Sequence, residues 1–452
     1  MKKYKLKLST TQVIMLSFLF VILIGSLLLA LPISSKNGKA VPYIDALFTA
    51  TTSTCVTGLV TLPTVTTWSV FGQIVILLLI QVGGLGIITV MTGLMVVLHR
   101  KIGLKDSRLI SDSFNLTSLS GLALFVKNVI FGTLIIEGVG ALLYMFVFVP
   151  EYGARGIWIS IFNSISAFCN AGIDIIAENS LCNYALNPFI NTVTGLLIVL
   201  GGIGYIVWWD IIRVLKYFRK EKMKCFKRLT LHSKIALSAT LILIFGGAVV
   251  IFILEYSNPL TIAHYSFFDK IQVSLFQSIT TRTAGFATMP QENLTNSTAI
   301  FCLFLMFIGG SPVGTAGGIK TVTIIVLFAT AYSAIKNKNE VSLFDRNLSR
   351  QITKKAVAVA TMSFSIVFIS AILLAAVTDA AAIDIIYETV SATATVGLSR
   401  NLTPYLGLCG KGILIATMYL GRIGPISLAV AFNSNKEKGN IIKNPTEEIS
   451  VG

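Results

Sequence analysis

The sequence has little charge and few of the side chains that carry out catalysis or bind metals. Only 12% of its 452 residues are charged, against roughly 25% in an ordinary soluble domain, and three are histidines. Its six cysteines are scattered and form no C-x-x-C pair, which argues against a metal site or a disulfide framework. No catalytic triad, metal cluster or phosphate-binding loop is recognisable. We therefore expect a protein that is not an enzyme and binds no cofactor.

Apolar residues dominate instead. They make up 54% of the chain and form runs of about 20 residues, the length that an α-helix needs to cross a hydrocarbon core of ~30 Å. Because backbone polar groups must be satisfied inside such spans, the expected fold is that of an all-α membrane protein. The first run, residues 11–31, is too long for a secretory signal and ends without an Ala-x-Ala site, so we predict a retained span.

The net charge of +16 has a simple explanation in membrane topology. Of the 36 lysines and arginines, 27 lie in five segments: residues 2–7, 100–127, 213–234, 336–355 and the C-terminal tail 436–452. Basic residues favour the cytoplasmic side of a membrane. We expect a multi-pass protein of the cell membrane, surrounded by lipid, with both termini and three basic linkers in the cytoplasm. No nucleic-acid partner is needed to explain the charge.

A phrase that ends in glycine occurs four times between apolar runs. The glycines are Gly58, Gly172, Gly285 and Gly397, separated by steps of 114, 113 and 112 residues. This spacing predicts four tandem helix–pore-loop–helix repeats around a pseudo-fourfold axis, with eight transmembrane helices and four re-entrant pore helices. The predicted boundaries are 1–98 for repeat one, 99–217 for a linker and repeat two, 218–335 for a linker and repeat three, and 336–452 for a linker, repeat four and tail.

The four loops are free of acids, which favours a monovalent over a divalent cation. Rings of neutral carbonyl or hydroxyl oxygens replace the water shell of an ion without holding it too tightly. Glycine at the shared position allows a positive φ, and the re-entrant helices direct the negative ends of their dipoles to the axis. The predicted K⁺-binding selectivity filter comprises Val56, Thr57, Gly58, Asn170, Ala171, Gly172, Thr283, Ala284, Gly285, Thr395, Val396 and Gly397.

The second helix of repeat three contains a run, residues 309–320, that cannot stay helical. Proline removes a hydrogen bond and glycine weakens the remainder, so we expect an intramembrane loop that gates the path, with a harmless kink as the alternative. We expect breaks of this kind in repeat three alone. The predicted gating residues are Gly309, Gly310, Gly314, Thr315, Ala316, Gly317, Gly318, Lys320 and, from repeat four, Arg422.

Other charges near the loops have structural or functional interpretations. Glu137 either supports a filter or helix backbone or belongs to a buried pair, and Arg282 is expected to hydrogen-bond to loop carbonyls or to a neighbouring helix. Asp45, Asp269 and Asp384 either cap the re-entrant helices or recruit external cations. Asp174 is the stronger candidate for recruitment.

These features together resemble the Trk/Ktr/HKT superfamily of potassium transporters, and within it the membrane subunits of Ktr systems. The resemblance covers essentially the whole chain and rests on four single-glycine loops, residues 281–286 and the break in repeat three. It implies potassium uptake through a channel-like pore, a homodimer, and a cytosolic nucleotide-binding regulatory ring of the KtrA type. Whether Na⁺ stimulates this uptake is left open. The alternative function is a Na⁺-coupled carrier of an organic solute.

Overall fold

The computed structural model describes residues 10–87, 89–92, 122–218, 222–338 and 340–424. Within these ranges the regular structure is helical except for a small hairpin of strands β1 (Ser342–Leu343) and β2 (Arg346–Asn347). The N-terminal lysines, most of the 100–127 linker and the tail 436–452, which are expected to lie in the cytoplasm, are outside the described residues.

Among the described residues, four single helices are long and apolar enough to cross a membrane. They are α1 (Thr10–Leu29), α7 (Leu122–Tyr152), α12 (Leu231–Glu255) and α16 (Arg350–Ala375). Each is the first helix of one predicted repeat. Large apolar side chains on these helices face outward, such as Phe20 (64% exposed) and Phe146 (73% exposed). Outward apolar faces of this length suit a lipid environment, so the molecule is a multi-pass membrane protein.

Each long helix is followed by a short helix that runs into the middle of the molecule and then by a second apolar helix. The short ones, here called the central helices, are α2 (Tyr43–Cys55), α8 (Ala154–Cys169), α13 (Phe267–Thr280) and α17 (Ala382–Ala394). The second helices begin with α4 (Val70–Leu85), α9 (Pro188–Gly202), α14 (Asn296–Phe307) and α18 (Leu408–Ile423). Two further helices, α10 (Tyr205–Leu215) and α15 (Thr321–Ile335), continue from α9 and α14.

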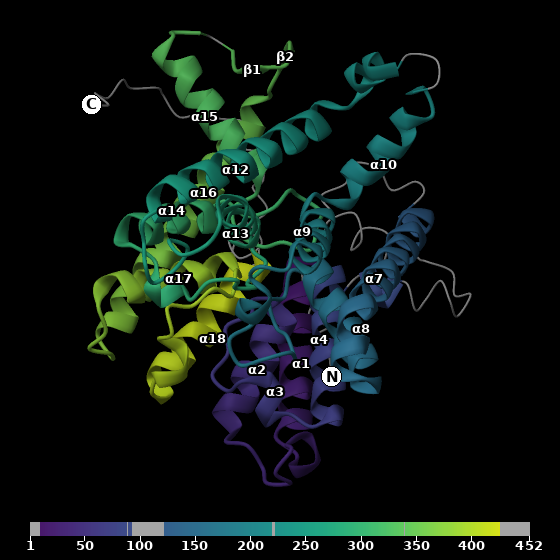
Figure 1. The fold of residues 1–452 in the computed structure, drawn as a ribbon. Helices are drawn as coiled ribbons and strands as arrows, with labels where there is room; N and C mark the ends of the chain where they lie inside the picture. The colour runs from purple at the N-terminus through teal and green to yellow at the C-terminus, as the bar shows by residue number, and fades with distance from the viewer. Residues whose placement is uncertain (1–9, 88, 93–121, 219–221, 339, 425–452) are drawn as a thin grey trace, which may run out of the picture.

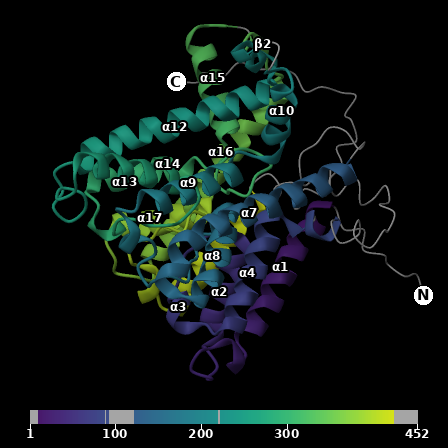
Figure 2. The same ribbon diagram turned by 45° about the vertical axis from the view of Figure 1, so that its right-hand side comes forward.

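The remaining helical segments are short. They comprise α3 (Thr64–Thr67) and the 3₁₀ turns η1 (Pro32–Ser34), η2 (Cys182–Tyr184), η3 (Lys222–Arg228), η4 (Gln291–Asn293) and η5 (Thr403–Tyr405). Figures 1 and 2 show α10, α15 and the β-hairpin gathered at one end of the molecule, while α3 lies toward the opposite end.

The contacts between successive units form a closed circuit. The second helix of one unit packs on the central helix of the next: α4 on α8, α9 on α13, α14 on α17 and, closing the circuit, α18 on α2. The last helix of the described chain therefore lies beside one of the first. This arrangement brings the C-terminal ends of all four central helices to the same place.

The expectation that repeat three alone has a broken second helix is wrong. The helices α9 and α10 meet at a bend of 98° around Gly204, whose φ is +91°. The helices α4 and α18 end in the same way, before Gly86 (φ +84°) and Gly424 (φ +88°). A single glycine in the left-handed region is enough to stop a helix, which explains why the sequence drew attention only to the longer run in repeat three.

Candidate functional site

Each central helix is followed by a residue with left-handed backbone, which stands two positions before the repeated glycine. Val56, Asn170, Thr283 and Thr395 have φ between +51° and +65°. Their glycines also have positive φ, from +64° at Gly172 to +100° at Gly58. Two of the three residues in each loop therefore have positive φ, so the chain turns sharply just beyond each central helix.

The four glycines lie against one another in a ring. A methyl group added to any of them would collide with the carbonyl oxygen of the residue before the next glycine. The added carbon would lie 2.6 Å from the Ala171 oxygen at Gly58, 2.6 Å from the Ala284 oxygen at Gly172 and 2.5 Å from the Val396 oxygen at Gly285. At Gly397 it would meet the oxygen of Thr57. The structure thus brings all four predicted loops together in chain order.

Hydroxyl groups on the central helices hold the loops in this shape. Thr52 accepts a hydrogen bond from the Gly58 N–H, and Ser391 accepts one from the Gly397 N–H, both at 3.0 Å. Ser166 donates to the carbonyl of Ile173 (2.5 Å) and Thr280 to that of Phe286 (2.6 Å). Because these bonds use the backbone groups beside each glycine, they fix the loops from behind and leave other loop carbonyls free.

The chemistry of this ring suits an alkali cation. All twelve predicted filter residues are buried, and none carries a charge. Backbone carbonyls and hydroxyls are hard, neutral oxygen donors, and the C-terminal ends of four helix dipoles add negative potential. Among the described residues, no group of three or more His, Cys, Asp and Glu side chains could hold a metal ion.

The predicted gating residues 309–320 form a compact, non-helical segment between α14 and α15. Its two ends pair with each other: the Gly309 N–H donates to the Ile319 carbonyl (2.9 Å), and the Thr321 N–H donates to the Gly310 carbonyl (3.0 Å). The segment is therefore a closed loop rather than a kinked helix, and the alternative of a simple kink is wrong.

This loop fills the space between the broken helix α9–α10 and the glycine ring. The Ser311 N–H donates to the Gly202 carbonyl (2.8 Å), and the Tyr205 N–H donates to the Val313 carbonyl (2.9 Å). On the other side, the Gly317 N–H donates to Thr283 Oγ1 (3.3 Å). A methyl group on Gly317 would overlap Thr395 Oγ1. The loop therefore touches the filter segments of two repeats directly.

Two positively charged side chains donate hydrogen bonds to carbonyls of this loop. Lys320 Nζ donates to the carbonyl of Ala316 (2.6 Å), and Arg422 Nη1 donates to that of Thr315 (2.7 Å). The other terminal nitrogen of Arg422 donates to the carbonyl of Gly83 in α4. Arg422 thus connects α18, the loop and α4, so the two charges that the sequence placed near the path do meet at the loop.

Glu137 and Arg282 occupy positions behind the ring. The Glu137 carboxylate accepts from Gln81 Nε2 (3.1 Å), and the thiol of buried Cys169 lies 3.8 Å from it. Its backbone carbonyl accepts from Ser164 Oγ of α8 (2.6 Å). Arg282 donates to Thr240 Oγ1 and to the Gly309 carbonyl, both at 3.4 Å. Glu137 therefore supports the second central helix, and Arg282 contacts the start of the 309–320 loop.

The four acids proposed as caps or cation attractors have different surroundings. Asp269 forms a reciprocal cap with Ser266, whose hydroxyl donates to it at 2.6 Å. Asp45 and Asp384 instead form ion pairs with Lys411 (2.5 Å) and Arg400 (2.7 Å). Asp174 is only 9% exposed and accepts from the Ile176 N–H. A buried acid of this kind is poorly placed to attract ions from solution.

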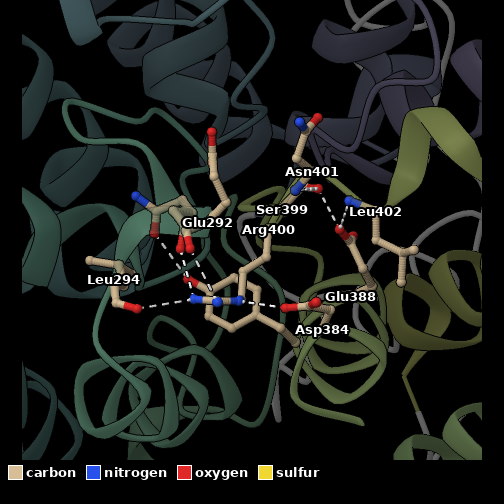
Figure 3. Close-up of polar contacts among 10 residues, drawn as sticks. Glu292, Leu294, Asp384, Glu388, Ser399, Arg400, Asn401 and Leu402 are labelled. Carbon is tan, nitrogen blue, oxygen red and sulfur yellow. Dashed lines mark hydrogen bonds and ion pairs between the residues drawn. The ribbon is translucent and has the colours of Figure 1, made fainter. Parts of the chain in front are cut away.

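Sequence reasoning missed a polar cluster beside the fourth loop. Arg400 binds Asp384 and the carbonyls of Gln291 (2.9 Å) and Glu292 (3.2 Å), which follow the third loop (Figure 3). Glu388 is fully buried and accepts from Ser399 Oγ and Thr403 Oγ1. The signal for Glu388 was present, since an acid inside a predicted re-entrant helix is unusual, but its partners come from a later loop.

A comparison with known protein families shows which family the chain belongs to. The sequence model of the TrkH family, described as a cation transport protein, matches residues 2–444. The chain belongs to this family. The family consists of membrane transporters rather than enzymes, in agreement with the expectation from composition.

Individual relatives cover the whole chain. It is 40% identical to the Ktr system potassium uptake protein B of Bacillus subtilis over 98% of this chain and 96% of that one. It is 36% identical to the potassium/sodium uptake protein NtpJ of Enterococcus hirae, with 100% and 99% covered. The crystal structure of the potassium transporter TrkH from Vibrio parahaemolyticus has the same fold, with a TM-score of 0.75 at 16% identity over 96% of this chain and 86% of that one.

Proposed function

We propose that this protein takes up K⁺ across the cell membrane through a channel-like pore. The observation that carries the proposal is the closed ring of four uncharged glycine loops, each contacting the next through a backbone carbonyl. Carbonyls from the twelve filter residues replace the water of the ion, and each central helix directs the negative end of its dipole to it. The names of two relatives, which specify potassium uptake, support the choice of ion.

The proposed architecture is a set of four repeats around a pseudo-fourfold axis. Each repeat crosses the membrane twice, with α9 and α10 counted as one crossing and α14 and α15 as another. Each also contributes one re-entrant central helix. Both termini then lie in the cytoplasm, as the basic linkers favour. The cyclic packing of α4 on α8, α9 on α13, α14 on α17 and α18 on α2 supports this arrangement.

In this proposal the 309–320 loop is the gate. It lies between the glycine ring and the bend of α9–α10, and it is held there by backbone hydrogen bonds and by Arg422 and Lys320. Glycine-rich backbone has little intrinsic preference for one conformation, so the loop can leave the path when these contacts break. Opening would then be a local rearrangement rather than a movement of whole helices.

The proposed assembly is a homodimer regulated by a cytosolic nucleotide-binding ring of the KtrA type. The B. subtilis relative is named as part of a Ktr system, which fits a transporter with further components. The basic linkers 213–234 and 336–355 supply positive surface on the proposed cytoplasmic side. The chain has no phosphate-binding motif of its own, so nucleotide sensing belongs to the partner.

The experiment is ion flux into proteoliposomes that contain the purified full-length protein. We expect K⁺ uptake in preference to Na⁺, and we expect Gly58→Ala to reduce that preference sharply. The new methyl group would lie 2.6 Å from the Ala171 carbonyl oxygen at a φ of +100°, a conformation that costs an L-residue about 1–2 kcal/mol.

The matched control is Gly246→Ala in α12, where no atom lies within 4 Å of the added methyl group. This variant should behave like the wild type. An unchanged K⁺ preference in Gly58→Ala would contradict the filter assignment. Uptake of Na⁺ that requires an organic solute would favour the alternative, a Na⁺-coupled carrier.

A further inference from the structure

The circuit of helices has one junction that the chain itself does not bridge. Successive repeats are joined by linkers, but the contact of α18 with α2 brings together the last and first units of the described chain. In the described part of the chain, side-chain contacts and helix packing hold this junction. Tyr419 of α18 donates to the carbonyl of Met15 in α1 (2.9 Å), and Leu414 and Met418 pack in one apolar cluster with Phe48.

An ion pair lies at the outer end of this junction. Lys411, in the first turn of α18, places Nζ 2.5 Å from Oδ1 of Asp45, in the first turn of α2. The two side chains are 14% and 9% exposed. Removing one partner of such a pair leaves an uncompensated charge in a poorly hydrated place, so each residue depends on the other.

Equivalent positions at two other junctions carry neutral hydrogen bonds. Gln73 and Asn191 stand ten residues before Gly83 and Gly201, as Lys411 stands ten before Gly421. These three glycines correspond, because each lies against a carbonyl near the end of its own central helix: Thr54, Phe168 and Thr393.

The neutral contacts link the same helices in the same order. Gln73 of α4 accepts from Trp158 Nε1 of α8 (2.8 Å). Asn191 of α9 and Gln272 of α13 both donate to the Ala185 carbonyl, at 2.7 Å and 3.3 Å. Gln272, Asp45 and Asp384 each stand thirteen residues before the glycine of their own loop. Three of the four junctions thus have polar contacts at these equivalent positions.

We propose that Lys411 and Asp45 form a latch that closes the ring at the junction without a linker and positions the first filter loop. The inference rests on the proposed function. The latch holds the start of α2, whose other end carries Val56, Thr57 and Gly58. Because α2 is a rigid helix of 13 residues, a displacement at Asp45 moves the Gly58 loop relative to Ala171 and Gly397. Lys411 and Asp45 are positioning residues that do not contact the ion.

The test uses the full-length protein in proteoliposomes with four variants: Asp45→Asn, Lys411→Met, the two together, and Lys39→Met. Lys39 is an exposed lysine in the connection that leads into α2, so its variant controls for loss of one positive charge nearby. The ratio of K⁺ to Na⁺ flux reports the position of the filter, and the midpoint of thermal unfolding in detergent reports stability.

Each single change at the latch should lower the flux ratio about fivefold, while Lys39→Met leaves it unchanged. The double variant should lose less than the product of the two single effects, because removing both charges leaves neither unpaired. Lys411→Arg, which keeps the charge, should retain most of the preference and serves if the neutral variants fold poorly.

Two results would overturn the latch. Unchanged flux ratios in the single variants, with or without a lower unfolding midpoint, would leave the pair with no positioning role. Effects that multiply in the double variant would show that the two residues act separately. If the wild-type protein carried no K⁺ at all, the proposed function would fail. The latch would still be tested by the unfolding midpoints, because a shift in the double variant equal to the sum of the two single shifts would contradict the coupling of the pair.

Discussion

At the level of single residues, the sequence predicted one part of the backbone conformation of the loops and missed another. The repeated glycines were predictable, because glycine is the residue that takes a positive φ without strain. The left-handed residues two positions earlier were not, since Val56 and Thr395 are β-branched and rarely adopt this backbone. Their conformation is imposed by the closure of the helix end and by the hydroxyl bonds of Thr52 and Ser391.

The roles of charged residues were only partly predictable for a related reason. Arg422 and Lys320 stood out because charges are rare in membrane spans, and both do bind the 309–320 loop. Asp45 and Asp384 look like helix caps in the sequence because each lies in a first turn. Their partners, Lys411 and Arg400, are far away in the chain or in a later loop, and only the fold brings them close.

At this scale we predict that Arg422→Met increases K⁺ flux. The guanidinium donates to the carbonyls of Thr315 and Gly83, and hydrogen bonds from a charged donor contribute about 1.5–3 kcal/mol each. Methionine is similar in length but cannot donate, so the loop should leave the path more often. Flux into proteoliposomes measures the effect, with Arg213→Met, on the proposed cytoplasmic side, as a control that should change little. Reduced or unchanged flux in correctly folded Arg422→Met would contradict a restraining role.

Among the helices, glycines determine where each second helix stops. The sequence identified the break in repeat three because five glycines and a proline cluster there, whereas in repeat two the same outcome requires only Gly204. The 98° bend after α9 matters for function because the freed carbonyls of Gly201 and Gly202 accept hydrogen bonds from the 309–320 loop. The break in one repeat thus forms part of the seat for the loop of the next.

We predict that shortening the loop between Gly310 and Gly318 raises K⁺ flux through the protein. The deleted residues contact Thr283 and Gly202, so their loss removes atoms from the space beside the ring and the bonds that hold the loop there. The measurement is K⁺ uptake in a host that lacks its own potassium uptake, compared at equal amounts of protein in the membrane. The control is Gly246→Ala in α12, a position with no role in the proposed pore or in the proposed partner contacts. Lower uptake in the shortened loop, at normal expression, would argue against a barrier.

For the whole molecule, the sequence predicted the class and the order of parts better than their contacts. Spacing alone placed Gly58, Gly172, Gly285 and Gly397 in equivalent positions, and the structure brings them into one ring. The sequence could not show how the ring of helices closes, because the contact between α18 and α2 joins segments more than 350 residues apart. Contacts at such separations depend on the shape of the entire ring rather than on any local pattern.

Charged residues of the last unit join it to both of its neighbours in the ring. Arg400, which forms an ion pair with Asp384 of the same unit, donates to the carbonyls of Gln291 and Glu292 after the third loop (Figure 3). Lys411 pairs with Asp45 of the first unit, and Arg422 donates to the Gly83 carbonyl of α4. These contacts fix the last unit to the third and to the first.

The central claim is that one bare alkali cation binds where the four glycine loops meet, and the most direct measurement is anomalous scattering from crystals grown with Rb⁺ or Tl⁺ in place of K⁺. The account predicts a strong peak on the axis of the ring, within reach of the carbonyls of Thr57, Ala171, Ala284 and Val396. Well-ordered loops with no peak at that position, and a strong peak elsewhere in the protein, would contradict it.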